Sequence, residues 1–365
     1  MSFEDSIRQH LLSLSPYDPV PHKSALVTHQ EMSSAPLIKL NGNENPYGPS
    51  PKVTKALTDF VEYHIYPDPN QIAVRHKLSM YTGVSVDSIV AGSGCDELID
   101  LLLRLMIDTG DEVIDCTPTF GMYSFSTHIC GGKVISVPRK KNFSVDVKAV
   151  LEAINHQTKI IFIASPNNPT GNMLAETDLL QLLATGILVV IDETYYEFSE
   201  STHLPVVGSY PNLVILRSLS KWAGLASLRI GYGLMNPTIA KWLMTIKSPY
   251  NINAGAELAL LASLEDVDYL KTNVQSIIEE RSRMSVRLAE IDGLYPLPSS
   301  GNFILVHTPR VAGSSIYEKL ATDNIFVRNL SDPRLLNYIR ISIGTREQNE
   351  RLTDSLAKII ADGSN

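Results

Sequence analysis

Short runs of Val, Ile and Leu alternate, along most of the chain, with segments whose apolar residues recur at helical spacing. The runs predict strands and the spaced segments predict helices. The predicted strands of this region lie at residues 88–91, 112–116, 133–137, 159–164, 187–191, 213–216 and 229–234. Helices are predicted between most of them, among them residues 97–106 and 176–183. Strands that are apolar throughout and alternate with helices indicate a mostly parallel sheet covered on both faces.

The pattern changes after residue 253. A long helix is predicted at residues 270–291, and short strands with helices between them follow at residues 303–307, 325–327 and 338–343. This succession is typical of an α+β domain. The predicted fold class is therefore α/β, with a large domain on a mostly parallel sheet and a smaller α+β domain. We assign residues 1–50 to an N-terminal arm and part of the small domain, 51–255 to the large domain and 256–365 to the small domain.

The first 81 residues carry weaker patterns. Four apolar residues at helical spacing predict a short amphipathic helix, namely Phe3, Ile7, Leu11 and Leu14. The segment that follows, to about residue 35, shows little periodicity, so we expect an extended arm that lies on another surface. Two further helices are predicted at residues 53–63 and 72–81.

Composition narrows the possible functions. The 365 residues carry a net charge of −8, which argues against a nucleic-acid partner because phosphate contacts need a basic surface. No apolar run approaches the roughly 18 residues of a membrane span, and the acidic start lacks the features of a signal or transit peptide. Three cysteines without C-x-x-C spacing favour a reducing cytoplasm. The nine histidines show no ligand spacing, so we predict no metal site.

The richest polar segment is residues 218–229 (S-L-S-K-W-A-G-L-A-S-L-R), which follows a predicted strand. The hydroxyls of Ser218 and Ser220, with the cation of Arg229, suit a phosphate group at a strand exit. Lys221, held among cations and apolar groups, can lose its proton and attack a carbonyl carbon. A phosphate and an aldehyde on one ligand describe pyridoxal 5′-phosphate. The alternative for Lys221 and Arg229 is a pair of solvated surface charges.

Two further strands are followed by groups that suit the same ligand. Residues 92–97 (G-S-G-C-D-E) open a helix, where small residues let backbone N–H groups surround an anion. Because the third glycine of a dinucleotide fingerprint is missing, the motif predicts a general phosphate cradle. Asp96 and Glu97 are alternatively first-turn acids favoured by the helix dipole. In residues 117–123 an aromatic side chain suits stacking on a flat heterocycle, although such residues more often belong to the core.

Three other segments have both a functional and a structural interpretation. Residues 165–171 (S-P-N-N-P-T-G) predict a rigid loop with a fixed amide that suits a phenolic oxygen, or a proline-stiffened turn. Asp192 ends an apolar strand, where a carboxylate is costly unless a cation such as a protonated pyridine nitrogen pairs with it. Tyr195 is then placed to reach the oxygen of the same ring; the alternative for Asp192 is a turn acid. Residues 41–49 are either a connector or an ordered loop facing a site.

Together these groups match one known family in chain order. The chain resembles the fold-type I pyridoxal-phosphate enzymes, the aspartate-aminotransferase-like superfamily, and within it the histidinol-phosphate aminotransferases. The resemblance extends from about residue 14 to residue 356. It rests on residues 165–171, 192–195, 218–221 with Arg229 eight positions after the lysine, and 341–346 (I-S-I-G-T-R), while residues 14–17, 40–48 and 118–123 favour this branch.

The resemblance implies specific roles around the cofactor. Lys221 is implied to bond to the cofactor aldehyde and then to move the substrate proton, and Asp192 to pair with the pyridine nitrogen. The remaining cofactor residues that it implies are Phe120 against the ring, Asn168 and Tyr195 at the ring hydroxyl, and Cys95, Asp96, Ser218, Ser220 and Arg229 at the phosphate. Tyr66 is implied to reach the phosphate in a neighbouring subunit, so we expect a homodimer. Trp222 stands where relatives commonly have a small residue, which leaves the packing beside the lysine open.

On the substrate side the resemblance implies anion binding by Arg340, with Arg328 and Tyr17 as further candidates. Arg328 is also consistent with a solvated residue at a strand end. One guanidinium site suits both a carboxylate and a phosphate. The implied activity is transamination between L-histidinol phosphate and 2-oxoglutarate in histidine biosynthesis, with small-molecule substrates and without a membrane or nucleic-acid partner.

Three alternatives to this activity remain at the level of the sequence. An aromatic or broad-specificity aminotransferase would share every cofactor residue, and a threonine-phosphate decarboxylase would also use a phosphorylated substrate. A regulator that senses the cofactor without catalysis would need a basic DNA-binding segment, and none precedes residue 40.

Overall fold

A computed structural model describes residues 3–27 and 35–362. Its larger sheet has seven strands in the order β2-β8-β7-β6-β5-β3-β4. Their bounds are β2 Ile89–Gly92, β3 Glu112–Thr117, β4 Lys133–Pro138, β5 Thr158–Ala164, β6 Leu188–Asp192, β7 Leu213–Ser218 and β8 Gly231–Met235. Only β8 pairs antiparallel with its neighbours in this sheet of the described chain. The predicted mostly parallel sheet is confirmed.

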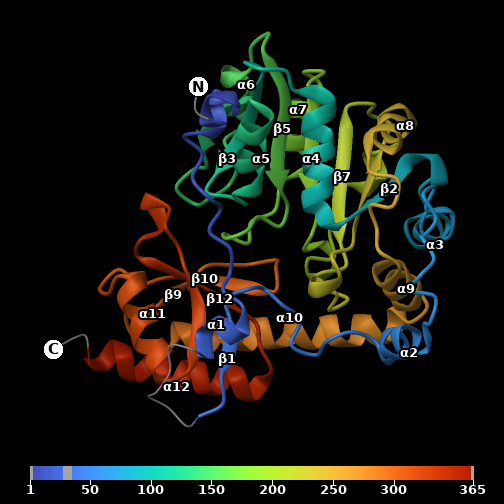
Figure 1. The fold of residues 1–365 in the computed structure, drawn as a ribbon. Helices are drawn as coiled ribbons and strands as arrows, with labels where there is room; N and C mark the ends of the chain where they lie inside the picture. The colour runs from blue at the N-terminus through green and yellow to red at the C-terminus, as the bar shows by residue number, and fades with distance from the viewer. Residues whose placement is uncertain (1–2, 28–34, 363–365) are drawn as a thin grey trace.

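Helices cover both faces of the large sheet (Figure 1). The helices beside the sheet strands are α3 Ile72–Thr82, α4 Gly94–Met106, α5 Met122–Cys130, α6 Val147–Ala153, α7 Glu176–Leu183 and α8 Pro237–Ile246. Two more helices, α2 Pro51–Asp59 and α9 Ala254–Ser263, lie beyond the sheet near one end of α10 Val267–Ala289 (Figure 1). The central strands β6 and β7 are buried along their whole length, which is why their sequences are apolar on both faces rather than alternating. Their carboxyl ends face the second sheet of the molecule (Figure 1).

The second sheet is small and mixed, with the strand order β1-β11-β12-β10-β9. Its strands are β1 Ile38–Leu40, β9 Tyr295–Pro296, β10 Phe303–His307, β11 Ile325–Asn329 and β12 Tyr338–Ser342. The helices α10 Val267–Ala289, α11 Gly313–Thr322 and α12 Arg346–Asp362 accompany it, and α1 Lys23–Val27 precedes it. The long helix α10 runs from the side of the large sheet to the small sheet (Figure 1). Strand β1 pairs with β11, so a segment near the N-terminus completes the C-terminal sheet. The division at residues 50 and 255 stays a prediction.

The amphipathic helix predicted from Phe3 to Leu14 is wrong. The structure has two short 3₁₀ turns there, Phe3–Ser6 and Gln9–Leu11. The side chain of Phe3 is 85% exposed, so the apolar stripe has no surface to bury itself against. A helix this short is marginal without such packing. The arm is held instead by polar contacts, such as the bond from Arg8 Nη2 to the Ile129 carbonyl at 2.8 Å.

Two smaller predictions also needed correction. The helix expected at residues 53–63 is α2, which starts at Pro51 behind the N-cap Ser50 and ends at Asp59; the apolar residues Val61 and Tyr63, which extended the pattern, are exposed. The arm is interrupted by α1, and its residues 28–34 lie outside the described part of the chain. Among the described residues, no helix combines the length and apolar character needed to cross a membrane.

Candidate active site

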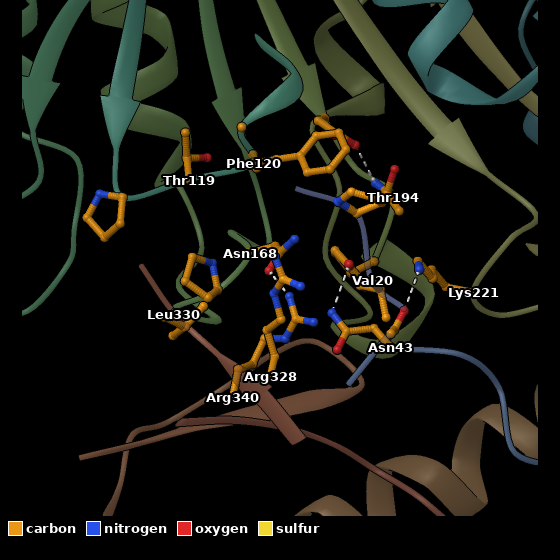
Figure 2. Close-up of a pocket in the computed structure, with 18 of the residues that line it drawn as sticks. Val20, Asn43, Thr119, Phe120, Asn168, Thr194, Lys221, Arg328, Leu330 and Arg340 are labelled. Carbon is orange, nitrogen blue, oxygen red and sulfur yellow. Dashed lines mark hydrogen bonds between the residues drawn. The ribbon is translucent and has the colours of Figure 1, made fainter. Parts of the chain in front are cut away.

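A cavity of about 730 Å³ lies between the carboxyl ends of the large-sheet strands and the small sheet. This is where ligands bind in open parallel sheets, and the volume is that of a small-molecule site. Thirteen of the fourteen predicted site residues line it: Tyr17, Cys95, Asp96, Phe120, Asn168, Asp192, Tyr195, Ser218, Ser220, Lys221, Arg229, Arg328 and Arg340. Figure 2 shows Phe120 reaching in from the large-sheet side, with Arg328 and Arg340 on the opposite side.

Lys221 lies just beyond β7, with its ammonium group enclosed by the cavity. Its Nζ donates to the Gly42 carbonyl at 3.0 Å, and Figure 2 shows this bond beside Asn43. Burial, followed by the nearby positive charge of Arg340, lowers the pKa of Lys221 to about 8. A lysine with this pKa is partly uncharged near neutral pH and therefore nucleophilic.

Asp192 is buried at the end of β6, 6% exposed. Its Oδ2 accepts a bond from the Tyr123 hydroxyl at 2.7 Å, and its Oδ1 accepts one from the Thr194 backbone N–H at 2.9 Å. Burial raises the pKa of Asp192 despite these bonds. No cationic side chain contacts the carboxylate among the described residues, so a protonated ring nitrogen in the cavity would supply the missing counter-charge.

The structure brings together the residues from which the sequence predicted a phosphate cradle. The start of α4, with Cys95 and Asp96, meets Ser218, Ser220 and Arg229 at one end of the cavity. Arg229 Nη2 bonds to Asp96 Oδ2 at 2.9 Å. A Cβ at Gly94 would lie 2.5 Å from Arg229 Nη2, so only glycine lets the guanidinium cross the helix start. Backbone N–H groups at a helix start, two hydroxyls and a guanidinium are the donor set of a phosphate site.

Asn168 and Tyr195 keep hydrogen-bond donors available to a ligand. The amide oxygen of Asn168 accepts from Arg340 Nη1 at 2.5 Å, which leaves the amide nitrogen as the group for a cavity ligand. The Tyr195 hydroxyl oxygen accepts from Asn43 Nδ2 at 3.0 Å. Burial raises the pKa of Tyr195, so its phenol stays protonated and can donate. Two donors that line the same cavity fit the ring hydroxyl of pyridoxal phosphate.

Arg340 and Arg328 extend from the small sheet toward the cavity (Figure 2). Arg340, on β12, is buried, and its Nη2 donates to the Asn41 carbonyl at 2.6 Å. Its Nε has no partner among the described residues. Burial lowers the pKa of Arg340 to about 10, which leaves it protonated at neutral pH. A buried, charged guanidinium with a free N–H is suited to an anionic substrate.

Arg328 and Tyr17 lie at the outer edge of the cavity, on its small-sheet side. Arg328 Nη2 lies 3.0 Å from Oδ2 of Asp18, whose side chain is 83% exposed. This ion pair holds the N-terminal arm so that Tyr17, next to Asp18, lies at the cavity. Because Asp18 is exposed, solvent screens the ion pair and weakens it. Burial raises the pKa of Tyr17, so its phenol is a neutral donor beside the two arginines.

Tyr66 is the predicted site residue that does not line the cavity of its own chain. It is 75% exposed and stacks on Tyr250, with ring centroids 4.4 Å apart. An exposed aromatic pair on one subunit is consistent with a contact to another copy, and its predicted role remains a proposal.

Trp222, beside the lysine, packs away from the cavity. Its side chain is 1% exposed, and its ring is parallel to that of Tyr81 with centroids 5.8 Å apart. Its carbonyl accepts from Asn45 Nδ2 at 2.8 Å. The indole is therefore part of the core, and the backbone of residue 222 ties the loop at residues 41–49 to the segment that carries Lys221.

The sequence did not single out three residues that shape the site: Tyr123, Asn43 and Thr194. Tyr123 ends the segment 117–123, where the sequence predicted only an aromatic side chain that stacks on a ring or belongs to the core; the structure brings its hydroxyl to Asp192. Asn43 belongs to the turn-rich loop that allowed two interpretations; its bonds to Tyr195 and its place in the cavity favour the functional one. No signal in the sequence distinguished Thr194 from an ordinary turn residue.

The residues present therefore fit pyridoxal phosphate at every group of the molecule. A phosphate cradle, a buried carboxylate without a counter-ion, two phenol-directed donors and a nucleophilic lysine share one cavity. Among the described residues, no cluster of three or more His, Cys, Asp or Glu side chains could hold a metal ion.

Comparison with known proteins agrees with this geometry. A family model described as aminotransferase class I and II matches residues 35–356. The histidinol-phosphate aminotransferase of Roseiflexus castenholzii is 41% identical over 362 residues, which cover 97% of this chain and 98% of that protein. The histidinol-phosphate aminotransferase of Dehalococcoides mccartyi is 44% identical over 327 residues, 90% of this chain and 91% of that protein.

A solved structure gives the same result. The crystal structure of histidinol-phosphate aminotransferase from Sinorhizobium meliloti, in complex with pyridoxal-5′-phosphate, matches with a TM-score of 0.88 and 27% sequence identity, covering 98% of each chain.

Proposed function

The chain belongs to the class I and II aminotransferases, and we propose that it transfers an amino group between L-histidinol phosphate and 2-oxoglutarate in histidine biosynthesis. The enzyme depends on pyridoxal phosphate. The observation that carries the substrate assignment is the pair of anion sites in one cavity: the phosphate cradle at α4 and the arginine pair Arg328 and Arg340 on the small sheet. The relatives at 41% and 44% identity support the same assignment.

Pyridoxal phosphate supplies an electron sink when it is bound. The chain's residues hold it and move protons. Asp192 keeps the ring nitrogen protonated, because a buried carboxylate without a counter-ion favours a cation beside it. Lys221 Nζ, with its lowered pKa, accepts and returns the proton at the reacting carbon. Asn168 and Tyr195 fix the ring orientation through their donors.

The arginine pair explains how one site accepts two substrates. The exchange reaction alternates between a phosphorylated amine and a dicarboxylate. A guanidinium fork binds either group in two-point geometry. Arg340, buried and charged, contributes the stronger interaction, and Arg328 together with Tyr17 closes the outer edge.

The assembly and location of the enzyme are part of the proposal. We place it in the cytoplasm, as a homodimer in which Tyr66 reaches the cofactor phosphate of the other subunit. The 75% exposure of Tyr66 and its absence from the lining of its own cavity support this role. A Tyr66→Phe enzyme should bind the cofactor more weakly while the mass of the assembly stays that of a dimer.

Substrate profiling tests the assignment. With 2-oxoglutarate as acceptor, kcat/KM for L-histidinol phosphate should exceed that for phenylalanine at least about 100-fold, because only the former offers a phosphate to Arg340. A higher value for phenylalanine would indicate an aromatic aminotransferase. Release of carbon dioxide from threonine phosphate would indicate a decarboxylase. In either case the fold and cofactor assignment would stand and the substrate assignment would fall.

A further inference from the structure

Asn43 belongs to the loop at residues 41–49 and lines the active-site cavity. Its side chain is buried, and its backbone has a φ of 52°, a left-handed conformation that asparagine adopts more readily than most residues. The carbonyl of the preceding Gly42 accepts the bond from Lys221 Nζ (Figure 2). Asn43 therefore lies in the part of the cavity that contains the reactive lysine.

Every polar atom of Asn43 has a hydrogen-bond partner. Its backbone N–H donates to Ser342 Oγ at 2.8 Å, and its backbone carbonyl accepts from Asn302 Nδ2 at 3.0 Å. In the side chain, Oδ1 accepts from Ser342 Oγ at 2.9 Å and Nδ2 donates to the Tyr195 hydroxyl at 3.0 Å. Ser342 ends β12 and Asn302 directly precedes β10. Asn43 thus joins two small-sheet residues to one residue of the large-sheet face.

The two bonds to Ser342 determine which way the Asn43 amide faces. The Ser342 hydroxyl accepts from the Asn43 backbone N–H, and its own single proton needs an acceptor, which Asn43 Oδ1 supplies. If the amide were turned over, the Ser342 proton would lose this acceptor. Because Ser342 is buried, an unpaired hydroxyl there is costly. The orientation that pairs every group therefore directs the amide N–H of Asn43 at Tyr195.

The amide in turn determines where the Tyr195 proton points. Since the phenol oxygen accepts from Asn43, its proton must be directed elsewhere. The Tyr195 ring packs edge-on against Phe303, with centroids 5.1 Å apart, which holds the phenol at the cavity that it lines. Arg340 and Asp192 act on the pKa of Tyr195 through their charges and do not bond to its hydroxyl. The phenol proton is therefore available to a ligand in the cavity.

We propose that Asn43 and Ser342 are positioning residues, which direct the phenol proton of Tyr195 onto the ring oxygen of bound pyridoxal phosphate. We call the chain Ser342–Asn43–Tyr195 the hydroxyl relay. Successive hydrogen bonds polarise one another, so the relay also makes Tyr195 a stronger donor. A donor at the ring oxygen stabilises its negative form, and the lysine-bound cofactor then releases its proton at lower pH. The proposal rests on the role of Tyr195 proposed above and not on which amine is the substrate.

The test is a pH titration of the visible absorbance of the cofactor-loaded enzyme without substrate, because its midpoint reports how tightly the cofactor holds that proton. Tyr195→Phe removes the donor and should raise the midpoint by at least about one pH unit. Asn43→Asp keeps the shape of the side chain but turns the donor into an acceptor, which takes the phenol proton away from the cofactor, so the midpoint should rise here too. Ser342→Ala frees the amide to turn over and should raise the midpoint by about half a pH unit.

A double-mutant cycle separates the hydroxyl relay from other effects of the same substitutions. In the Tyr195→Phe background there is no phenol proton to direct, so Ser342→Ala should move the midpoint by less than about 0.3 pH unit. Asn43→Asp retains there only the direct effect of its charge on the cofactor, and its shift should be smaller than in the wild type by at least about half a pH unit.

Thermal unfolding and circular dichroism check that each variant is folded, and Ser342→Ala carries the test alone if Asn43→Asp is not. Equal shifts in both backgrounds, or wild-type midpoints in every folded variant of Asn43 and Ser342, would overturn the proposal. A wild-type midpoint in Tyr195→Phe would remove the role of Tyr195 at the ring oxygen, and the hydroxyl relay with it. The proposed transamination would stand in each of these cases, because substrate profiling tests it separately.

Discussion

The two faces of the active-site cavity differ in how their charged groups are held. On the large-sheet face, Asp192 is buried and Lys221 is half-buried. The pKa of each is displaced toward the neutral form, and no oppositely charged side chain among the described residues contacts either group. On the small-sheet face, Arg340 and Arg328 are already bonded, to backbone and amide oxygens or to Asp18. The first face is therefore prepared for a cofactor with its own charges. The second face keeps a fixed positive charge that can bind either the phosphate of one substrate or the carboxylate of the other.

If this contrast is correct, substitutions on the large-sheet face should remove chemistry and those on the small-sheet face should remove substrate affinity.

Lys221→Ala should have the largest effect. Without Nζ the proton at the reacting carbon has no carrier, so turnover should fall at least about 10⁴-fold, near the upper limit for a general acid–base group. The cofactor should still bind through the phosphate cradle. Steady-state rates and cofactor absorbance after dialysis measure both. Repeated turnover by Lys221→Ala would remove the lysine from the mechanism.

Asp192→Asn should reduce kcat by about 10² to 10³, the range for losing one preorganised electrostatic partner. An amide has nearly the shape of the carboxylate but does not hold a proton on the ring nitrogen. Tyr123→Phe is the matched control, because it removes only one hydrogen bond to the same carboxylate. That change should cost about 1 kcal/mol, or roughly fivefold. Equal losses in both variants would show that geometry, and not charge, matters at this position.

Arg340→Lys should raise KM for both L-histidinol phosphate and 2-oxoglutarate about 100-fold, since altering one partner of a buried charged pair costs about 2–5 kcal/mol. The positive charge remains, but the two-point fork is lost. Steady-state kinetics with each substrate varied in turn measure the effect. A fall in kcat with KM unchanged would contradict the assignment of Arg340 to substrate binding.

Arg328→Lys should have a smaller effect of the same kind, about fivefold or less in KM, because its partner Asp18 is exposed and solvent screens the pair. Comparing the increase in KM with that of Arg340→Lys shows whether the buried or the outer arginine contributes more to substrate binding. A larger effect at Arg328 would mean that the arm, and not the buried arginine, selects the substrate.

The smallest effect links the two faces. In the cofactor-free protein, the rate at which Lys221 captures pyridoxal phosphate should rise about tenfold per pH unit and level off near pH 8, because only the uncharged amine reacts and its pKa is lowered to about 8. The positive charge of Arg340 contributes to that lowering. Arg340→Met should therefore move the midpoint to higher pH. A midpoint near 10.5, the ordinary lysine value, would contradict the buried environment of Lys221.

The sequence predicted one face of the cavity better than the other. Asp192, Ser218 and Lys221 directly follow apolar strands of a parallel sheet, and the carboxyl ends of such strands meet at one edge. Their meeting place follows from the pattern alone. On the small-sheet face, the pairing of β1 with β11 and the crossing of the arm depend on long-range packing that no local pattern encodes. Arg340 and Arg328 were found there through the family resemblance.

Two failures have the same physical origin. The apolar spacing of Phe3 and Ile7 predicted a helix, but a stripe forms a helix only where a surface buries it. The Tyr123 hydroxyl was missed because an aromatic side chain after a strand more often belongs to the core, and only the tertiary fold brings this hydroxyl to Asp192.

The central claim is that the small-sheet face selects a phosphorylated amine for the chemistry of the large-sheet face. Single-turnover mixing of the cofactor-loaded enzyme with L-histidinol phosphate, without an acceptor, tests it most directly through the visible absorbance of the bound cofactor. We expect full bleaching as the cofactor takes up the amino group. L-histidinol, which lacks the phosphate, should need at least about 100-fold higher concentration, corresponding to loss of a charged pair with Arg340. Equal bleaching by the two amines, or bleaching by phenylalanine alone, would contradict it.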